Sequence, residues 1–152
     1  MTTTNTDGIK KQIVLRATPA RVWRAVSNAR EFGTWFGVEL RDDFAPGAVV
    51  RGTVVYKGRQ LPITFQIERM EPERLLAFRW HPYAVDPAID YAGEPTTLVE
   101  FRLTEARGGI ELTVVESGFD RVPLERRAEA YRMNSQGWSA QMESIERYVS
   151  AT

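Results

Sequence analysis

One carboxylate occupies a position where the sequence pattern predicts an apolar side chain. In the strand predicted over Ile110–Glu116, the alternating inward positions hold Ile110, Leu112, Val114 and Glu116. A carboxylate removed from water either forms a salt bridge or has a raised pKa. Glu116 is therefore the candidate if acid–base chemistry takes place, and a pairing with an arginine or a backbone turn is its structural alternative.

Polar and small residues also interrupt the apolar stripe of the C-terminal segment. Asn134 lies on this stripe, and a buried amide must find partners. We consider a structural bond to a loop carbonyl and a contact with a ligand. Gly137 costs about 1 kcal/mol relative to alanine in a helix interior. Either the helix packs closely there, or the missing side chain leaves room beside Trp138.

Aromatic residues are frequent on the predicted inward faces. Tyr56, Trp80 and Tyr131 each combine apolar area with one polar tip, which suits a small-molecule pocket. Ordinary core packing is the alternative for each of them alone. The predicted ligand-binding residues are Trp35, Tyr56, Phe65, Trp80, Phe101, Glu116, Tyr131, Asn134 and Trp138.

Composition excludes several kinds of site. The chain has no cysteine and one histidine, His81, so no cysteine-based metal site or thiolate nucleophile exists, nor any site that needs two histidines. We expect His81 to be exposed or bonded to its own loop. The net charge is zero, which argues against nucleic acid as a partner. No phosphate-binding or dinucleotide-binding motif is present, and we predict no catalytic residue, metal or cofactor.

These side chains must be positioned mainly by β-strands. Six segments alternate apolar and polar residues and are separated by turn residues, which is typical of an antiparallel sheet with one solvated face. A short strand near Val38–Arg41 is a candidate seventh. The six segments are Ile9–Ala17, Val49–Lys57, Pro62–Met70, Leu75–His81, Thr97–Thr104 and Ile110–Glu116.

Helices are predicted at two places. Thr18 and Pro19 form a helix start after the first strand, and a second short helix follows over Arg30–Phe36. The segment Val122–Val149 forms one long helix of about 40 Å. Its predicted apolar stripe includes Leu124, Ala128, Tyr131, Asn134, Trp138, Met142, Ile145 and Val149.

The remaining segments bound the domain. Residues 1–8 are predicted to be a disordered tail, and residues 9–150 a single domain. The segment His81–Pro95 has three prolines and no periodicity, which favours a mobile loop at a cavity mouth or an edge. We find no signal peptide or membrane-spanning segment, so no membrane insertion is predicted and a cytoplasmic location is expected by default.

Five short motifs resemble the START-like superfamily, also called SRPBCC or helix-grip proteins, and within it the AHSA-type group. They cover roughly residues 9–150 and are Ala17–Trp23, Trp35–Gly37, Leu76–Trp80, Glu116–Phe119 and Asn134–Trp138. The resemblance implies an α+β fold in which a curved antiparallel sheet of six to seven strands wraps around the long C-terminal helix. The two short helices follow the first strand.

Function is less constrained, because one fold hosts many activities. We expect the domain to bind a small hydrophobic or aromatic molecule between the sheet and the long helix, as a non-catalytic carrier or sensor. The alternatives are an enzyme of the polyketide-cyclase or hydrolase type and a co-chaperone-like interaction module. A homodimer and a chaperone partner therefore also stay open.

Overall fold

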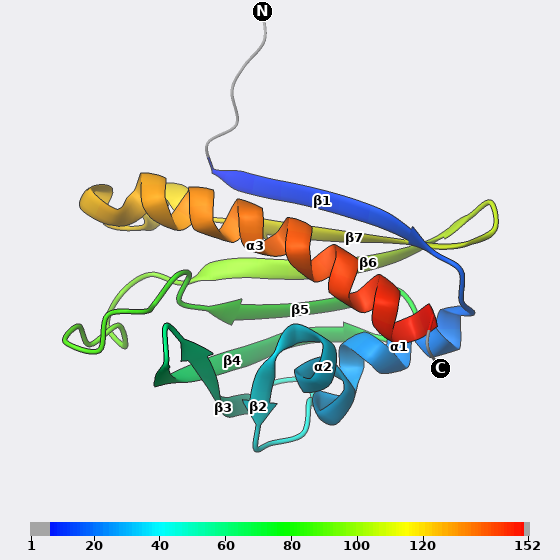
Figure 1. Ribbon diagram of the computed structural model, residues 1–152, viewed down its shortest axis with the longest axis horizontal. Helices are drawn as coiled ribbons and strands as arrows, with labels where there is room; N and C mark the ends of the chain where they lie inside the picture. Colours follow the sequence, from blue (N-terminus) through cyan, green and yellow to red (C-terminus); the bar gives the residue numbers. More distant parts are fainter. Residues whose placement is uncertain (1–6, 151–152) are drawn as a thin grey trace, which may run out of the picture.

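A computed structural model of the chain describes residues 7–150, and seven strands within them form one antiparallel sheet in the order β1-β7-β6-β5-β4-β3-β2. The sheet curves around the C-terminal helix (Figure 1). The six predicted strands and the short seventh are all present. Their bounds are β1 Gly8–Leu15, β2 Val38–Leu40, β3 Val49–Tyr56, β4 Arg59–Glu71, β5 Leu75–Trp80, β6 Thr97–Ala106 and β7 Gly109–Ser117.

The last two residues of the predicted N-terminal tail, Asp7 and Gly8, belong to the folded domain. Residues 1–6 lie outside the described residues, so the prediction of disorder is not addressed there. Gly8 already belongs to β1, where it pairs with Ser117 of β7. The Asp7 carboxylate accepts hydrogen bonds from the backbone N–H groups of Gly118 and Asp120 at 3.2 and 3.1 Å.

Two short helices follow β1, as the capping residues predict. Helix α1 spans Pro19–Ser27, and the Thr18 hydroxyl accepts a hydrogen bond from its first turn at 3.2 Å. Helix α2 spans Ala29–Phe36 and is capped by Asn28. A short 3-10 turn, η1, spans Phe119–Arg121 and leads into the last helix.

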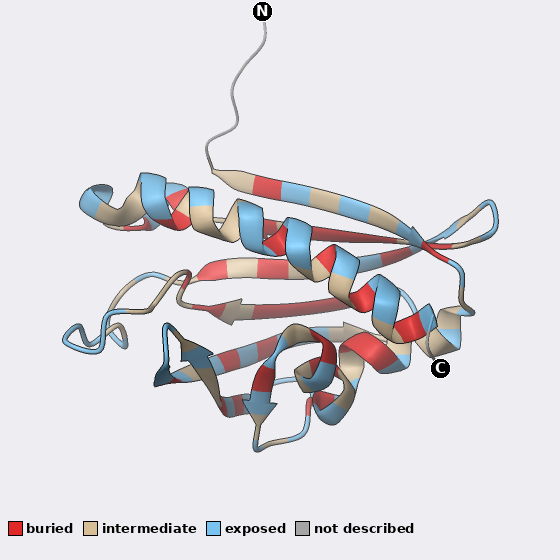
Figure 2. Cartoon of the chain, viewed as in Figure 1, coloured by how far each residue is buried: buried red, intermediate tan, exposed pale blue. Residues whose placement is uncertain are grey.

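The long helix α3 spans Leu124–Ser150 and crosses the sheet on its concave side (Figure 1). Its last four turns are anchored by Trp138, Met142, Ile145 and Val149, which are all buried. The predicted stripe is wrong at the start of the helix: Leu124 is 76% exposed and Ala128 is also exposed. The reason is that the first turns of α3 extend past the strand ends, so no sheet lies beneath them (Figure 2).

The core fills the space between the sheet and the three helices. Its largest fully buried rings are Phe32, Phe65, Phe78, Phe101 and Phe119. Phe65 and Phe78 stack at a centroid distance of 4.5 Å. None of the described helices is long and apolar enough to cross a membrane.

Candidate functional site

Glu116 is at the centre of a buried polar cluster between the sheet and α3. Its carboxylate has no exposed surface. Oε1 accepts from the Trp138 indole at 2.8 Å and from the Asn134 amide at 3.0 Å. Oε2 accepts from the Trp80 indole at 2.7 Å, from the Thr97 hydroxyl at 2.5 Å and from Asn134 at 3.2 Å. Four side chains from three elements thus point at one carboxylate.

Strand register and helical spacing bring these donors together. Trp80 ends β5 and pairs directly with Thr97, the first residue of β6. Glu116 of β7 pairs with Val99, two residues further along β6 on the same face. Asn134 and Trp138 are four residues apart, so they lie one turn apart on one side of α3. Neither spacing requires an unusual backbone.

The donors of the cluster are uncharged. Among residues 7–150, no arginine or lysine forms an ion pair with Glu116, so the predicted arginine or backbone partner is wrong. Burial raises the pKa of Glu116, and the hydrogen bonds from Thr97, Trp80, Trp138 and Asn134 oppose this shift without cancelling it. The site therefore holds an acid with a stronger affinity for its proton than an ordinary glutamate.

Aromatic rings enclose the cluster. Trp80 and Trp138 stack at 5.6 Å with an interplanar angle of 28°. The half-buried ring of Phe36 lies 5.9 Å from each of them. Phe65 packs on Trp80 and Phe101 packs on Trp138, each at 5.6 Å. Four predicted aromatic residues therefore share one space with Glu116 and Asn134, and Phe36 is an additional member.

Two predicted residues belong to other contacts. Trp35 is 4% exposed, and its indole N–H donates to the backbone carbonyl of Ala25 at 2.8 Å, which fastens α2 to α1. The Tyr131 hydroxyl donates to the carbonyl of Gly8 at 2.9 Å, and its ring packs on Phe119 at 5.3 Å. The ring of Trp35 also packs edge-on against Phe36 and Phe101 at 5.9 and 6.2 Å, so Trp35 borders the aromatic rings of the cluster. The contacts described for Tyr131 join α3 to β1 and η1.

Tyr56 forms part of a clasp that joins the loop of residues 81–96 to the rest of the domain. Its hydroxyl is 3.0 Å from that of Tyr83, and Tyr83 donates to Glu129 of α3 at 3.4 Å. The hydrogen bond with Tyr56 raises the pKa of Tyr83 to about 12. Arg126 of α3 adds an ion pair to Glu94 of the same loop. The loop is therefore fastened mainly by polar contacts at its two ends.

His81 is bonded within its own loop, as predicted: its Nε2 is 3.1 Å from the carbonyl oxygen of Glu94. Of the two explanations offered for Gly137, close packing of the helix is wrong, and room beside Trp138 stays a prediction. Gly137 is exposed, and a methyl group added to it would meet no atom within 4 Å. The loop-carbonyl partner predicted for Asn134 is also wrong, because its amide donates to Glu116.

Sequence reasoning missed Thr97 and Tyr83 as members of the site. Thr97 had a usable signal, because it precedes Val99 and Phe101 at the same period-2 positions. Tyr83 had none, since it lies in a loop without periodicity and has a left-handed backbone, with φ of 51°.

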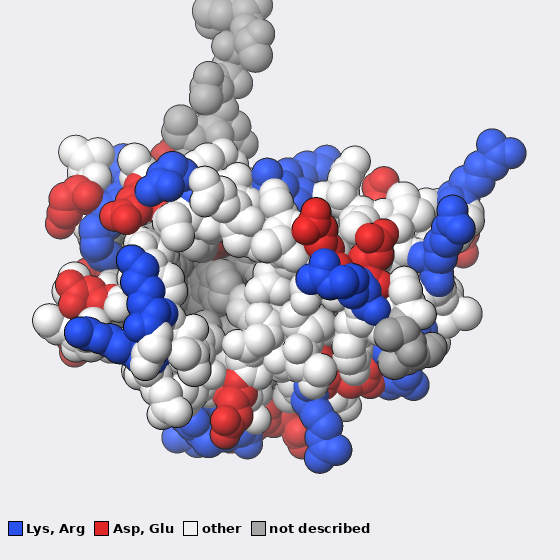
Figure 3. Space-filling view, in the orientation of Figure 1, with Lys and Arg blue, Asp and Glu red and all other residues white. Residues whose placement is uncertain are grey.

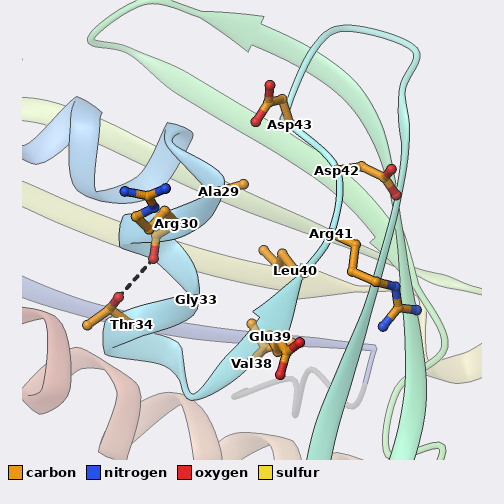
Figure 4. A pocket seen from close by; sticks show the side chains of 10 residues that line it. All are labelled: Ala29, Arg30, Gly33, Thr34, Val38, Glu39, Leu40, Arg41, Asp42 and Asp43. Carbon is orange, nitrogen blue, oxygen red and sulfur yellow. Dashed lines mark hydrogen bonds between the residues drawn. The ribbon is translucent and has the colours of Figure 1, made fainter.

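Three hollows in the surface of the described residues bear on the position of a binding site. One of about 420 Å³ lies between α2, β2 and the segment after β2, and its lining carries both signs of charge (Figure 4). Another, of about 580 Å³, is lined by Val14, Arg16, Arg107, Gly108 and Glu146. A third is visible between the first half of α3 and the strands below it, with mainly uncharged walls (Figure 3). The third lies over the space between the sheet and the first half of α3.

A curved antiparallel sheet that grips a long C-terminal helix, with two short helices after its first strand, defines the helix-grip class of α+β proteins. The chain belongs to the family of Activator of Hsp90 ATPase homolog 1-like proteins, whose model matches residues 16–150. No curated protein shows a significant match.

Solved structures share this fold. Protein MLL2253 from Mesorhizobium loti is 22% identical, with a TM-score of 0.75 over 95% of this chain and 98% of its own. DynU16, described as a putative protein in the dynemicin biosynthetic locus, is 26% identical, with a TM-score of 0.71. That match covers 95% of this chain and 47% of DynU16. The Aha1 dimer from Colwellia psychrerythraea is 11% identical, with a TM-score of 0.68 over 93% of this chain and 95% of its own.

Proposed function

We propose that this protein binds a small, largely hydrophobic or aromatic molecule between the sheet and α3, and that it acts as a carrier or sensor. The observation that carries the proposal is the Glu116 cluster. Small-molecule sites are mostly apolar and contain a few converging polar groups. Glu116, Thr97 and Asn134 are such groups, and the surrounding residues are tryptophan and phenylalanine.

The entrance that we propose is the hollow beside the first half of α3 (Figure 3). The residues expected to meet a ligand there are half-buried rather than buried, since a fully enclosed side chain offers no surface. Phe36, Asn134, Tyr56 and Tyr83 fit this condition. Trp80 and Trp138 are 8% and 2% exposed, so they would form the floor of the site.

Tryptophan fluorescence tests this proposal, because a ligand on that floor would change the emission of Trp80 and Trp138. We expect a saturable change with hydrophobic aromatic probes such as 1-anilinonaphthalene-8-sulfonate and naphthalene. Asn134→Leu should weaken the response, whereas Ser139→Ala, an exposed change on the same helix, should leave it intact. Absence of any saturable response, together with no co-purifying small molecule in native mass spectrometry, would refute the proposal.

Catalysis of the cyclase or hydrolase type would make an additional demand on Glu116. The carboxylate would have to exchange a proton with the bound molecule. All four of its donors come from the protein itself, so one of these hydrogen bonds must open first. Asn134 is the half-buried member and therefore the one that could move. A Glu116→Gln variant that retains full binding but loses turnover would identify such an enzyme.

A protein-interaction role is the second candidate, and family membership favours it. Val55 and Leu124 are 68% and 76% exposed, so apolar surface is available at the hairpin of β3 and β4 and at the start of α3. Analytical ultracentrifugation would detect a homodimer. The ATPase rate of the Hsp90 chaperone with and without this protein would test a chaperone partner, and paired aspartates at Val55 and Leu124 should abolish either effect.

A further inference from the structure

The charge of the ligand can be inferred from the Glu116 cluster, on the condition that the proposed binding site exists. We infer that the molecule taken up beside Glu116 is an organic cation, namely an amine carried on an aromatic or aliphatic body.

The donors match an ionised carboxylate. An ionised carboxylate offers about four lone-pair sites and no proton. Trp80, Trp138, Asn134 and Thr97 supply four donor groups to it. The two indoles can only donate, so a proton on Glu116 could be accepted within the cluster only by the amide oxygen of Asn134, which would require a flipped amide, or by the Thr97 hydroxyl. That hydroxyl would then lose its own acceptor, because it makes no other hydrogen bond that we describe.

Among the residues that the structure describes, no counter-charge accompanies this carboxylate. A buried charge normally has an ionic partner, because the removal of an ion from water costs several kcal/mol. Strands β5 and β6 and helix α3 present only uncharged groups to Glu116, and β1 places Ile9 opposite it. A positively charged ligand would supply the missing partner, whereas beside a neutral one Glu116 would stay an uncompensated anion or, because burial raises its pKa, take up a proton.

Asn134 relays this negative charge toward the open side. Its Nδ2 must face Glu116, because a carboxylate only accepts, and this fixes the orientation of the amide. Its Oδ1 then points away from Glu116, and we describe no protein donor for it. Asn134 is half-buried, whereas the other members of the cluster are buried, so its Oδ1 belongs to the member that retains the most exposed surface. The half-buried ring of Phe36 adds an aromatic face, to which ammonium groups are also attracted.

Three probes of nearly equal shape separate charge from apolar contact. Propylbenzene carries a methyl group where 2-phenylethanol carries a hydroxyl and phenethylammonium carries an ammonium. Dissociation constants measured at about pH 8 by tryptophan fluorescence and ligand-observed NMR should rank phenethylammonium tightest. We expect about tenfold over 2-phenylethanol, the size of a desolvated charge interaction. Propylbenzene should bind less tightly than phenethylammonium.

Substitutions test whether the charge of Glu116 causes the preference for phenethylammonium. Glu116→Gln keeps the size of the side chain and removes its charge, so the preference for phenethylammonium should disappear. Glu143→Gln removes an exposed carboxylate from the same helix and should leave the preference unchanged. Asn134→Ala deletes the acceptor and should reduce the preference even if Glu116→Gln fails to fold. Circular dichroism of each variant establishes that it is folded.

The outcomes distinguish this inference from the proposed function. If propylbenzene or 2-phenylethanol binds as tightly as phenethylammonium, the site exists and the inference of a cation is wrong. The same conclusion follows if folded Glu116→Gln or Asn134→Ala keeps the full preference. If none of the three probes binds, the binding function and the cation inference both fail.

Discussion

Replacing Trp138 by phenylalanine removes one donor from Glu116 while an aromatic ring stays in place. The chain offers a matched control in Trp35. The two tryptophans are 2% and 4% exposed, and each indole N–H donates at 2.8 Å. Trp138 donates to a carboxylate and Trp35 to the backbone carbonyl of Ala25. Because the loss of ring volume is the same, the difference between the variants reports the charge of the acceptor.

The expected magnitudes follow from the two kinds of hydrogen bond. A bond to a charged group contributes about 1.5–3 kcal/mol, and a neutral one about 0.5–1.5 kcal/mol. At about pH 8, Trp138→Phe should therefore lower the free energy of unfolding by about 1–1.5 kcal/mol more than Trp35→Phe. Urea unfolding followed by far-UV circular dichroism measures both values without relying on the substituted tryptophan.

The pH dependence supplies the decisive comparison. Because the pKa of Glu116 is raised by burial, the folded protein binds this proton more tightly than the unfolded chain. This contribution to stability is fully present below the unfolded pKa and is lost as the pH rises through the folded pKa. Protonation also makes the bond from Trp138 neutral, so its excess cost should vanish at low pH. Equal losses for Trp138→Phe and Trp35→Phe at both pH values would refute the charged hydrogen-bond account.

Three further changes test other parts of the structure. Gly137→Ala should raise the free energy of unfolding by about 0.5–1 kcal/mol, measured in urea, because the position is helical and open to solvent; a loss would mean that the helix is packed there. Glu31→Gln should cost about 1 kcal/mol at neutral pH. Burial raises the pKa of Glu31, but its hydrogen bonds and the charges of Arg21 and Arg24 outweigh this and lower the pKa. The cost should therefore disappear as the pH falls through that lowered pKa, and a pH-independent cost would contradict it. Tyr83→Phe should accelerate hydrogen exchange across residues 81–96, because it breaks the clasp to α3, and unchanged exchange would show that the loop is held otherwise.

The order of elements could be predicted from the sequence because each signal is local. Alternation with period two identifies a strand without knowledge of its neighbours, and Thr18 with Pro19 specifies a helix start by its own chemistry. The start of α3 shows the limit of this reasoning. Leu124 and Ala128 fit the apolar stripe, yet they are exposed, because burial depends on whether the sheet reaches that far.

The sequence predicts individual residues of the candidate site, but it does not predict the hydrogen bonds that join them. Glu116 and Asn134 were each recognised as polar groups on an inward face, and each was expected to bond with a different partner. They bond with one another across 18 positions of the chain, and Trp80 joins them from 36 positions away. Partners at such separations depend on strand register and on where α3 crosses the sheet. The periodicity of the sequence predicts neither the strand register nor the point at which α3 crosses the sheet.

Stability alone does not account for a buried carboxylate at this position. Replacement of a buried ionic group by well-packed apolar side chains is often neutral or stabilising, whereas removal of one partner is costly. Phe65, Phe78 and Phe101 already show that this core can be filled with hydrocarbon. A further apolar side chain in place of Glu116 would hold α3 without a desolvated charge. What only a carboxylate can provide is a negative potential at the base of an aromatic site, and that is the property a bound cation would use.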